Sequence, residues 1–315
     1  MKVSRGALEI VAASQAMIEL VKVVERLAGA RSTVLLEGES GTGKDLIAHL
    51  LHYGGNRSGG PLIKVHCPSI PEDLLESELF GHERGAFTDA AATKIGKLEM
   101  ADGGTIYFDQ VQDLSPALQA KLLRVLEERR FERLGATRTI EVDVRFVSSS
   151  NVDLRRAIEQ GSFRGDLYHR LSVVPVTLPP LRERREDIVP LAEHFLARGR
   201  EHYRTPAKTF EPAVLDLLKG YHWPGNVREL RSVIERASLY AQQEAISTAA
   251  LPAHLLEQPH ALWIGRSRHL SLGEVEEAYI RFVLEQLGGS QTRAAAVLGI
   301  SRKSLWERRR RFGIP

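Results

Sequence analysis

The chain carries the stretch Gly38-Glu39-Ser40-Gly41-Thr42-Gly43-Lys44 just after the apolar run Thr33-Val34-Leu35-Leu36. The apolar run is typical of a buried strand, and residues 46–51 after the lysine have the pattern of a helix. A strand, a glycine-rich turn, a lysine and a helix make up the P-loop pattern, in which backbone N–H groups and the lysine bind phosphate oxygens. These residues therefore predict a binding site for a nucleoside triphosphate.

One residue departs from this pattern. The position after the lysine usually holds serine or threonine, whose hydroxyl ligates Mg²⁺, and this chain has Asp45 there. A carboxylate can still hold magnesium, directly or through water. We therefore expect ATP and Mg²⁺ as ligands, with Asp45 among the ATP-binding residues.

The composition is typical of a soluble globular protein of two or three domains. Of the 315 residues, 26% are charged and 43% are hydrophobic, and no apolar run approaches the roughly 18 residues that span a bilayer. The N-terminus lacks the apolar core of a signal peptide, and the single cysteine, Cys67, excludes an internal disulfide. These features predict a cytoplasmic protein with no membrane partner.

Short apolar runs alternate with helical patterns in the first half of the chain. The candidate strands are residues 33–36, 62–66, 105–109, 142–148 and 173–178. Such alternation predicts an α/β fold with a parallel sheet covered by helices, and residues 188 to about 255 read as helices only. We expect an α/β ATPase subdomain at 1–178, a helical lid at 179–256, a linker at 257–270 and a small all-α domain at 271–315.

A second predicted strand ends in an acidic residue. It reads Thr105-Ile106-Tyr107-Phe108-Asp109 and is followed by Gln110. A carboxylate at the carboxyl edge of a sheet beside a P-loop can hold Mg²⁺, so Asp109 is the candidate metal ligand. A glutamate that polarises the attacking water would normally follow, whereas Gln110 cannot accept a proton but can still orient water. A purely structural role for Asp109 is the alternative.

These motifs closely resemble those of one family, the AAA+ transcription activators that work with sigma-54 RNA polymerase (bacterial enhancer-binding proteins). The family's P-loop also ends in an acid, and matching segments cover almost the whole chain. They are an insertion loop at 78–90, an arginine-finger segment at 163–171, a sheet-to-lid junction at 178–184 and a lid sensor motif at 223–230. The resemblance implies an AAA+ P-loop ATPase with a parallel sheet, a helical lid and a C-terminal helix-turn-helix domain.

The resemblance also implies roles for polar residues around the nucleotide. Arg164 and Arg170 would reach the γ-phosphate of a neighbouring subunit, so hydrolysis would require a homo-oligomeric ring, for which a hexamer is expected. Asn151 would position water or sense the γ-phosphate, and Arg228 would contact the nucleotide from the lid. The alternatives are surface salt bridges for the two arginines and a strand-end cap for Asn151.

The chain contains Gly85-Ala86-Phe87-Thr88-Asp89-Ala90, which resembles the loop with which this family contacts sigma-54. Gly85 permits a tight turn, and Phe87 is an aromatic residue at the tip. The resemblance implies that the loop moves with the nucleotide state, and a buried aromatic in a hairpin is the alternative. The family usually has glycine where this chain has Asp89, a change that adds a charge and removes torsional freedom.

Two departures affect the hydrolysis switch of this family. An asparagine usually stands before Cys67, where it hydrogen-bonds the catalytic glutamate and couples it to the loop. Here these two positions are His66 and Gln110. The pair of changes indicates a re-engineered or degenerate switch, unless Gln110 is a laboratory substitution that traps ATP.

The C-terminal segment is basic, although the net charge of the whole chain is only +3. Residues 291–313 resemble the Fis-like helix-turn-helix, with Ser290 and Ser301 as caps of helices at 292–298 and 302–312 and a turn at Gly299. The residues expected to pack the two helices together are Ala295, Leu298, Ile300 and Leu305. The DNA-binding candidates are Thr292, Arg302, Ser304, Trp306 and Arg308.

A helix expected at 272–287 precedes this motif and carries an apolar stripe. Its members are Val275, Tyr279, Phe282, Val283 and Leu287. An apolar stripe on one helix face suits dimerisation. A purely structural helical bundle is the alternative for the whole C-terminal unit.

Together the motifs predict an ATP-dependent transcription activator that binds double-stranded DNA upstream of promoters and remodels the sigma-54 closed complex. A DNA-binding regulator that holds ATP without hydrolysing it is the alternative, motivated by His66, Asp89 and Gln110. A replication initiator or helicase loader is a third alternative, which the loop at 85–90 disfavours. The family often has a sensing domain ahead of the ATPase; if its absence is natural, a regulatory protein in trans must control activity.

Overall fold

The computed structural model describes residues 2–5, 8–87, 90, 92–203, 205–241, 243–256, 271–287 and 290–314. Internal contacts divide the chain into two units, Met1–Lys219 with Trp223–Ala250, and Gly220–His222 with Leu251–Pro315. The predicted linker at 257–270 lies outside the described residues, and the predicted domain boundaries stay predictions. In the described part, no helix is long and apolar enough to cross a membrane.

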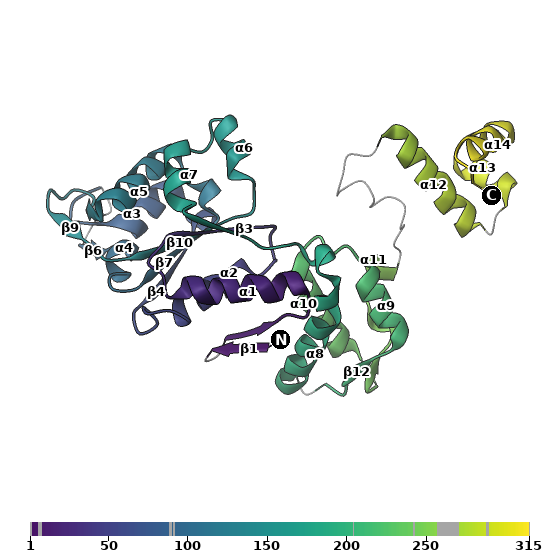
Figure 1. Cartoon of the computed structure of the whole chain (residues 1–315), viewed down its shortest axis with the longest axis horizontal. Helices are drawn as coiled ribbons and strands as arrows, with labels where there is room; N and C mark the ends of the chain where they lie inside the picture. Colours follow the sequence, from purple (N-terminus) through teal and green to yellow (C-terminus); the bar gives the residue numbers. More distant parts are fainter. Residues whose placement is uncertain are drawn as a thin grey trace. The chain divides into compact units, whose positions relative to one another are not determined.

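Among the described residues, a parallel sheet of five strands forms the centre of the first unit (Figure 1). Its order is β11-β3-β10-β7-β4. The strands are β3 Val34–Glu37, β4 Leu62–His66, β7 Thr105–Asp109, β10 Arg145–Ser150 and β11 Val174–Thr177. The predicted α/β fold with a parallel sheet is confirmed, and the largest error in a strand start is at β10, which begins three residues later than predicted.

Successive strand residues belong to two different cores, because side chains alternate between the faces of a sheet. Leu35 belongs to one core, whereas Val34 and Leu36 belong to the other. Helices α1 Gln15–Ala28 and α2 Lys44–Tyr53 cover the second core. The first core is covered by α3 Glu72–Phe80, α4 Lys97–Met100, α5 Pro116–Glu128, α6 Leu154–Glu159 and α7 Gly165–Leu171.

Short antiparallel pairs accompany the main sheet. They are β1 Lys2–Arg5 with β2 Leu8–Val11, β5 Gly81–His82 with β6 Lys94–Ile95, and β8 Arg130–Glu132 with β9 Thr139–Glu141. The β5–β6 pair forms the base of the predicted insertion loop. A single bridge between His82 and Leu134 joins that base to the β8–β9 hairpin.

The lid follows the sheet and consists mainly of helices. These are α8 Ile188–Tyr203, α9 Pro212–Gly220 and α10 Asn226–Tyr240, and α8 packs against α10. The prediction of helices only was wrong in one detail, since β12 Thr209–Phe210 pairs with β13 Ala245–Ile246. Strands of two residues are too short to show a periodic pattern in the sequence.

The second unit contains α11 Ala253–Leu256, α12 Leu272–Gln286, α13 Gln291–Val297 and α14 Arg302–Arg311. Gly299 makes the turn between α13 and α14 with φ +65°, and Ser301 caps α14 by accepting a hydrogen bond from Ser304 N at 3.1 Å. Ser290 stands at the N-cap of α13, but its side chain makes no capping hydrogen bond, so that part of the prediction was wrong.

The core of the helix-turn-helix contains the residues expected there, and it also takes in much of the predicted dimerisation stripe. Ala295 and Leu305 are buried, and Leu298 and Ile300 pack beside them. Three members of the stripe, Phe282, Val283 and Leu287, lie in or against the same core. Of the predicted stripe, only Val275 and Tyr279 stay exposed. The outward stripe is therefore shorter than the sequence suggested.

Arg145, the first residue of β10, is a buried charge that ties two helices to the sheet. Its guanidinium donates to the carbonyl oxygens of Leu27 and Ala28 in α1, both at 2.7 Å, and of Leu51 in α2 at 2.9 Å. Carbonyls in the last turn of a helix lack intrahelical donors and favour a nearby cation. Burial, with a smaller contribution from Arg57, lowers the pKa of Arg145, but a guanidinium remains charged.

We predict that Arg145→Met lowers the free energy of unfolding by about 3 kcal/mol, because it leaves buried carbonyls without donors. Chemical denaturation followed by circular dichroism measures this quantity. Arg124→Met is the matched control, since it removes an exposed arginine that pairs with Glu128 four residues later. The control should have a much smaller effect, and equal effects of the two variants would contradict the role assigned to Arg145.

Candidate nucleotide site

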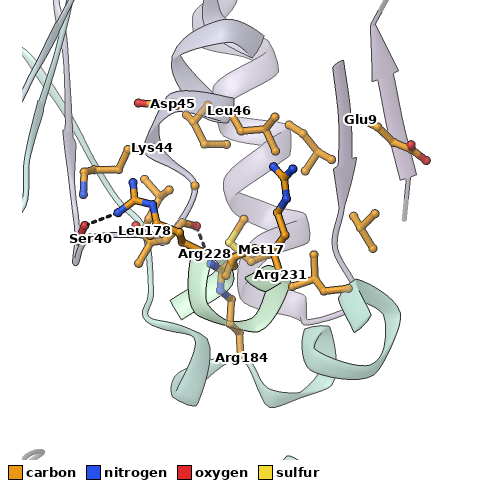
Figure 2. Close-up of a pocket in the computed structure, with 18 of the residues that line it drawn as sticks. Glu9, Met17, Ser40, Lys44, Asp45, Leu46, Leu178, Arg184, Arg228 and Arg231 are labelled. Carbon is orange, nitrogen blue, oxygen red and sulfur yellow. Dashed lines mark hydrogen bonds between the residues drawn. The ribbon is translucent and has the colours of Figure 1, made fainter. Parts of the chain in front are cut away.

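The predicted P-loop connects β3 to α2, and Lys44 is the first residue of α2. The glycines permit this turn, since Gly41 and Gly43 adopt φ +80° and +107°. A cavity of about 350 Å³ opens beside the loop, within the range of about 300–1,000 Å³ usual for ligand pockets. Figure 2 shows the guanidinium of Arg228, from lid helix α10, beside Lys44 and Ser40, whereas Arg231 of the same helix lies farther from Lys44.

Lys44 is held over the loop by backbone oxygens. Its ammonium donates to the carbonyl oxygens of Gly38 and Glu39, the latter at 2.9 Å, and the side chain is buried. Burial lowers the pKa of Lys44, and the nearby carboxylates Asp109 and Asp45 oppose that shift. The ammonium thus lies at the place where the P-loop pattern expects it.

Charged and amide groups of the lid hold the P-loop from the other side. The Glu39 carboxylate accepts two hydrogen bonds from Arg182, at 2.7 and 2.8 Å, and one from Asn226 Nδ2 at 3.1 Å. The hydrogen bonds from Arg182 hold the pKa of Glu39 below its ordinary value. Arg184, which is buried, donates to the carbonyl oxygen of Thr42 at 2.7 Å. We call these contacts the loop–lid clamp.

A backbone hydrogen bond and a side-chain hydrogen bond continue the loop–lid clamp. Val227 N donates to the carbonyl oxygen of Gly41 at 3.0 Å, and Arg228 donates to Ser40 Oγ at 2.9 Å (Figure 2). A Cβ atom on Gly41 would lie 2.3 Å from the carbonyl oxygen of Gly225, so only glycine fits there. The loop and the start of α10 therefore touch directly, and Arg228 lies in the cavity as expected.

The two acidic candidates lie on the third side of the cavity and share two partners. Lys64 Nζ lies 2.5 Å from Asp45 and 3.1 Å from Asp109. The Tyr107 hydroxyl lies 2.9 Å from Asp45 and 3.3 Å from Asp109, so it can donate its proton to either carboxylate. Ser149 donates to Asp109 at 2.8 Å. Burial alone would raise the pKa of Asp109, but the Ser149 hydrogen bond and the Lys64 ammonium outweigh it and hold that pKa below its ordinary value.

The sequence reasoning missed Lys64, Tyr107 and Ser149. All three lie on strands, and their side chains meet because β4 and β10 flank β7 in the sheet. Lys64 stands opposite Tyr107, and His66 stands opposite Asp109, in the β4–β7 register. Strand order was the missing information, although the alternate spacing of Lys64 and His66 at the end of a predicted strand was a usable signal.

The two departures from the family's switch belong to different contacts. His66 Nδ1 lies 3.0 Å from Asp109 Oδ2, whereas Gln110 Oε1 accepts a hydrogen bond from Asn151 Nδ2 at 3.1 Å. The interpretation that both changes fall on one contact was therefore wrong for this conformation. Gln112, which the sequence reasoning did not single out, donates to Asn151 Oδ1 at 2.8 Å.

Gln110 is also strained, with φ +64° and ψ +63°. A non-glycine residue in this left-handed region costs on the order of 1 kcal/mol, and such residues cluster at functional sites. The conformation turns the carboxamide toward Asn151, and both side chains line the cavity. The two predicted water-positioning residues are therefore brought together.

The two predicted arginine fingers do not line this cavity in their own chain. Arg164 pairs with Asp166 at 2.7 Å and Arg170 with Glu127 at 2.9 Å, and all four side chains are exposed. Their catalytic role stays a prediction, since it requires a neighbouring subunit.

The predicted sigma-54 loop has a tight turn and an exposed aromatic residue. Gly85 adopts φ +83° and its N–H donates to the carbonyl oxygen of Ala90 at 2.9 Å. Phe87 is 41% exposed, and its ring meets that of His82 edge-on with centroids 4.8 Å apart. The structure thus disagrees with the alternative of a buried aromatic. Thr88 and Asp89 lie outside the described residues.

The helix-turn-helix presents most of the predicted DNA-binding side chains to solvent. Arg302 and Trp306 are exposed on α14, and Arg310 packs over the Trp306 ring at 5.6 Å. Thr292 is exposed on α13 and Ser304 is half-buried. Arg308 pairs with Glu276 of α12 at 2.9 Å, so this candidate already has an intramolecular partner.

We predict that Gly41→Ala weakens binding of an ATP analogue at least about tenfold, because the methyl group would push the lid away from the loop and strain a positive φ. Fluorescence titration measures the affinity. Gly29→Ala is the control, since a Cβ there meets nothing within 4 Å. Unchanged affinity of Gly41→Ala would show that the loop–lid clamp is irrelevant to the ligand.

All three parts of the chain match known families. Residues 10–177 match the sigma-54 interaction domain, residues 182–262 the AAA+ ATPase lid domain, and residues 271–312 the bacterial regulatory proteins of the Fis family. These matches agree with the resemblance stated from the motifs.

Individual proteins agree with the family matches. The regulatory protein AtoC of Escherichia coli K12 is 44% identical over an alignment of 310 residues. The alignment covers 96% of this chain and 67% of AtoC. The transcriptional regulatory protein ZraR of the same strain is 45% identical over 297 residues, 94% of this chain and 67% of ZraR. The chain thus spans about two thirds of the length of these relatives. The crystal structure of NtrX from Brucella abortus in complex with ATP superposes with a TM-score of 0.75 at 35% identity, covering 97% of this chain and 70% of NtrX. The chain therefore belongs to the family of sigma-54-dependent transcription activators that join an AAA+ ATPase to a Fis-type DNA-binding domain.

Proposed function

We propose that this protein binds DNA upstream of promoters, assembles into a ring, and uses ATP to drive the Phe87 loop against sigma-54 RNA polymerase. The observation that carries the proposal is the cavity between P-loop and lid, which brings Lys44, Asp109 and Arg228 together. The same chain bears an exposed aromatic loop and a basic recognition helix. A site for a triphosphate, an output element and a DNA-binding element are the parts that such an activator needs.

Magnesium fits the donor set of this cavity. Asp45 and Asp109 converge on one cation, the Lys64 ammonium, so the space between them accepts positive charge. Among the described residues, no group of three or more His, Cys, Asp and Glu side chains could hold a metal. The pair Asp45 and Asp109 suits Mg²⁺, which commonly uses one or two carboxylates and completes its shell with phosphates and water. When bound, the metal would neutralise charge on the transferring phosphoryl group.

The placement of two arginines supports the proposal of a ring. Arg164 and Arg170 lie outside the cavity of their own chain and are exposed. Their ion pairs with Asp166 and Glu127 lie at the surface, where such pairs contribute little. Both guanidinium groups are therefore available to a neighbour's γ-phosphate, and a hexamer is the assembly that we propose.

The helix-turn-helix supports a DNA role through charge and exposed surface. The exposed Arg302 and Trp306 lie near the N-terminal half of α14, where a recognition helix contacts base edges. The run of arginines 309–311 follows in the last turn and suits phosphate contacts, which position a protein on DNA.

Hydrolysis depends on residue 110. A carboxamide can orient the attacking water but cannot take its proton. Proton transfer to a general base raises the rate of such reactions by about 10²–10⁴-fold. We predict slow turnover of ATP by the chain with Gln110 and an increase of at least about 100-fold in Gln110→Glu. Phosphate release at saturating ATP and DNA measures both. The control is Gln110→Glu combined with Lys44→Ala, which should be inactive.

The alternative function is a DNA-binding regulator in which ATP is a structural ligand. The observation that favours it is the engagement of Gln110 with Asn151 in place of a catalytic carboxylate. If Gln110→Glu and the chain with Gln110 both bind ATP and are equally inactive, this alternative replaces our proposal. Appreciable turnover with Gln110 eliminates it.

We predict that Phe87→Ala retains binding of an ATP analogue but reduces nucleotide-dependent association with sigma-54 at least about tenfold, because it removes the exposed ring from the loop. Tyr240→Ala is the matched control, since Tyr240 is an aromatic residue 65% exposed on the lid. Association is measured by a pull-down or by fluorescence anisotropy with labelled sigma-54. Normal association of Phe87→Ala would contradict the assigned output element.

A further inference from the structure

Lys64 stands between the two carboxylates that the proposed function gives to magnesium. Its ammonium lies 2.5 Å from Asp45 Oδ2 and 3.1 Å from Asp109 Oδ2. The three side chains come from α2, β4 and β7, so the contact is built by the packing of the sheet against α2 and not by local sequence. The Tyr107 hydroxyl lies within hydrogen-bond distance of both carboxylates and can donate its one proton to either.

The environment keeps this lysine charged. Burial alone would lower the pKa of Lys64, but hydrogen bonds and charge attraction from Asp45 and Asp109 outweigh it and raise that pKa. The ammonium also lies 5.5 Å from the centre of the Tyr107 ring, within the range of a cation–π contact. Lys64 is therefore a cation that balances the charge of Asp45 and Asp109.

Exposure differs among the members of this cluster. The side chain of Asp109 is 13% exposed, whereas those of Lys64 and Asp45 are 37% and 53% exposed. Lysine has a flexible stem, so the ammonium can leave toward solvent without a change in the backbone. Asp109 cannot leave in this way, because β7 and Ser149 hold it at the sheet edge.

A divalent ion ligated by both carboxylates would stand within a few ångströms of this ammonium. Two cations at such a short distance repel each other, and the repulsion is strong in a partly buried site. Occupation of the two carboxylates by Lys64 and by metal is therefore mutually exclusive.

We propose that Lys64 is a tethered cation that holds the space between Asp45 and Asp109 in the nucleotide-free protein and that a divalent metal must displace it. This inference rests on the proposed metal role of Asp45 and Asp109. Competition from the Lys64 ammonium gives the site a low affinity for free Mg²⁺, so the metal enters together with the triphosphate. The nucleotide-free and loaded states then differ by a movement of the Lys64 side chain on β4, two residues before His66.

The test uses the nucleotide-free full chain and Mg²⁺ alone. In EDTA, Lys64→Met should lower the melting temperature by about 3 °C, because two carboxylates lose their cation. Titration with MgCl₂ should restore the melting temperature of Lys64→Met, whereas that of the unmodified chain should stay flat over the same range. The double variant Lys64→Met with Asp45→Asn should lose the response to Mg²⁺, which locates it at this pair.

A second measurement uses nucleotide. The Mg²⁺ concentration that half-saturates binding of a fluorescent ATP analogue should fall at least about tenfold in Lys64→Met, since the metal no longer competes with the ammonium. Lys121→Met is the matched control, because Lys121 pairs with Glu76 at the surface away from the cavity. It should leave both responses unchanged.

Two results would overturn the inference. A Lys64→Met variant that is destabilised but insensitive to Mg²⁺ would make Lys64 a purely structural ion pair. A rise in the Mg²⁺ requirement for nucleotide would mean that Lys64 assists the metal. Failure of the proposed function appears separately, as absence of ATP binding or of sigma-54 association, while the Mg²⁺ titration of the nucleotide-free chain still reports on Lys64.

Discussion

The carboxylate of Glu39 accepts hydrogen bonds from Arg182 and Asn226, and through them the P-loop is attached to the lid. A P-loop binds phosphate with backbone N–H groups, so its conformation must be fixed by something outside its own glycines. Here the sheet-to-lid junction and the start of α10 supply that support, and Arg184 adds a third contact at Thr42. The ligand cavity consequently has walls from both subdomains. A ligand bound in the cavity therefore contacts both the sheet subdomain and the lid.

A continuous run of chain leads from the same cavity to the exposed loop. His66, the last residue of β4, contacts Asp109, and the next residues are a short helix at Cys67–Ser69 and then α3. Helix α3 ends at Phe80, where β5 begins the hairpin that carries Phe87. The packed interior transmits displacement because it is dense. A shift at the end of β4 can therefore reach the loop through α3 without a change in fold.

Local patterns predicted those parts of the molecule whose structure depends on neighbouring residues in the sequence. The P-loop, the strand that ends at Asp109 and the turn at Gly299 belong to this class, since each combines a periodic run with a glycine or an acid at a set position. The partners of Asp109 could not be predicted in this way, because Lys64 and Ser149 reach it only through the order of strands in the sheet. The extent of the exposed apolar stripe on α12 was predicted wrongly for a related reason. Periodicity shows that a helix has an apolar face but does not show which element covers that face. The role proposed for Arg164 and Arg170 requires a second subunit, and the sequence of one chain does not show how two subunits meet.

The central claim is that ligand binding between the P-loop and the lid is coupled to the Phe87 loop. Amide hydrogen exchange of the full chain, with and without Mg²⁺ and a non-hydrolysable ATP analogue, tests it most directly. The account predicts changed exchange in three segments at once, namely residues 38–45, residues 223–230 and the hairpin residues 81–87. Changes limited to the first two segments, with the hairpin unaffected at saturating ligand, would contradict it.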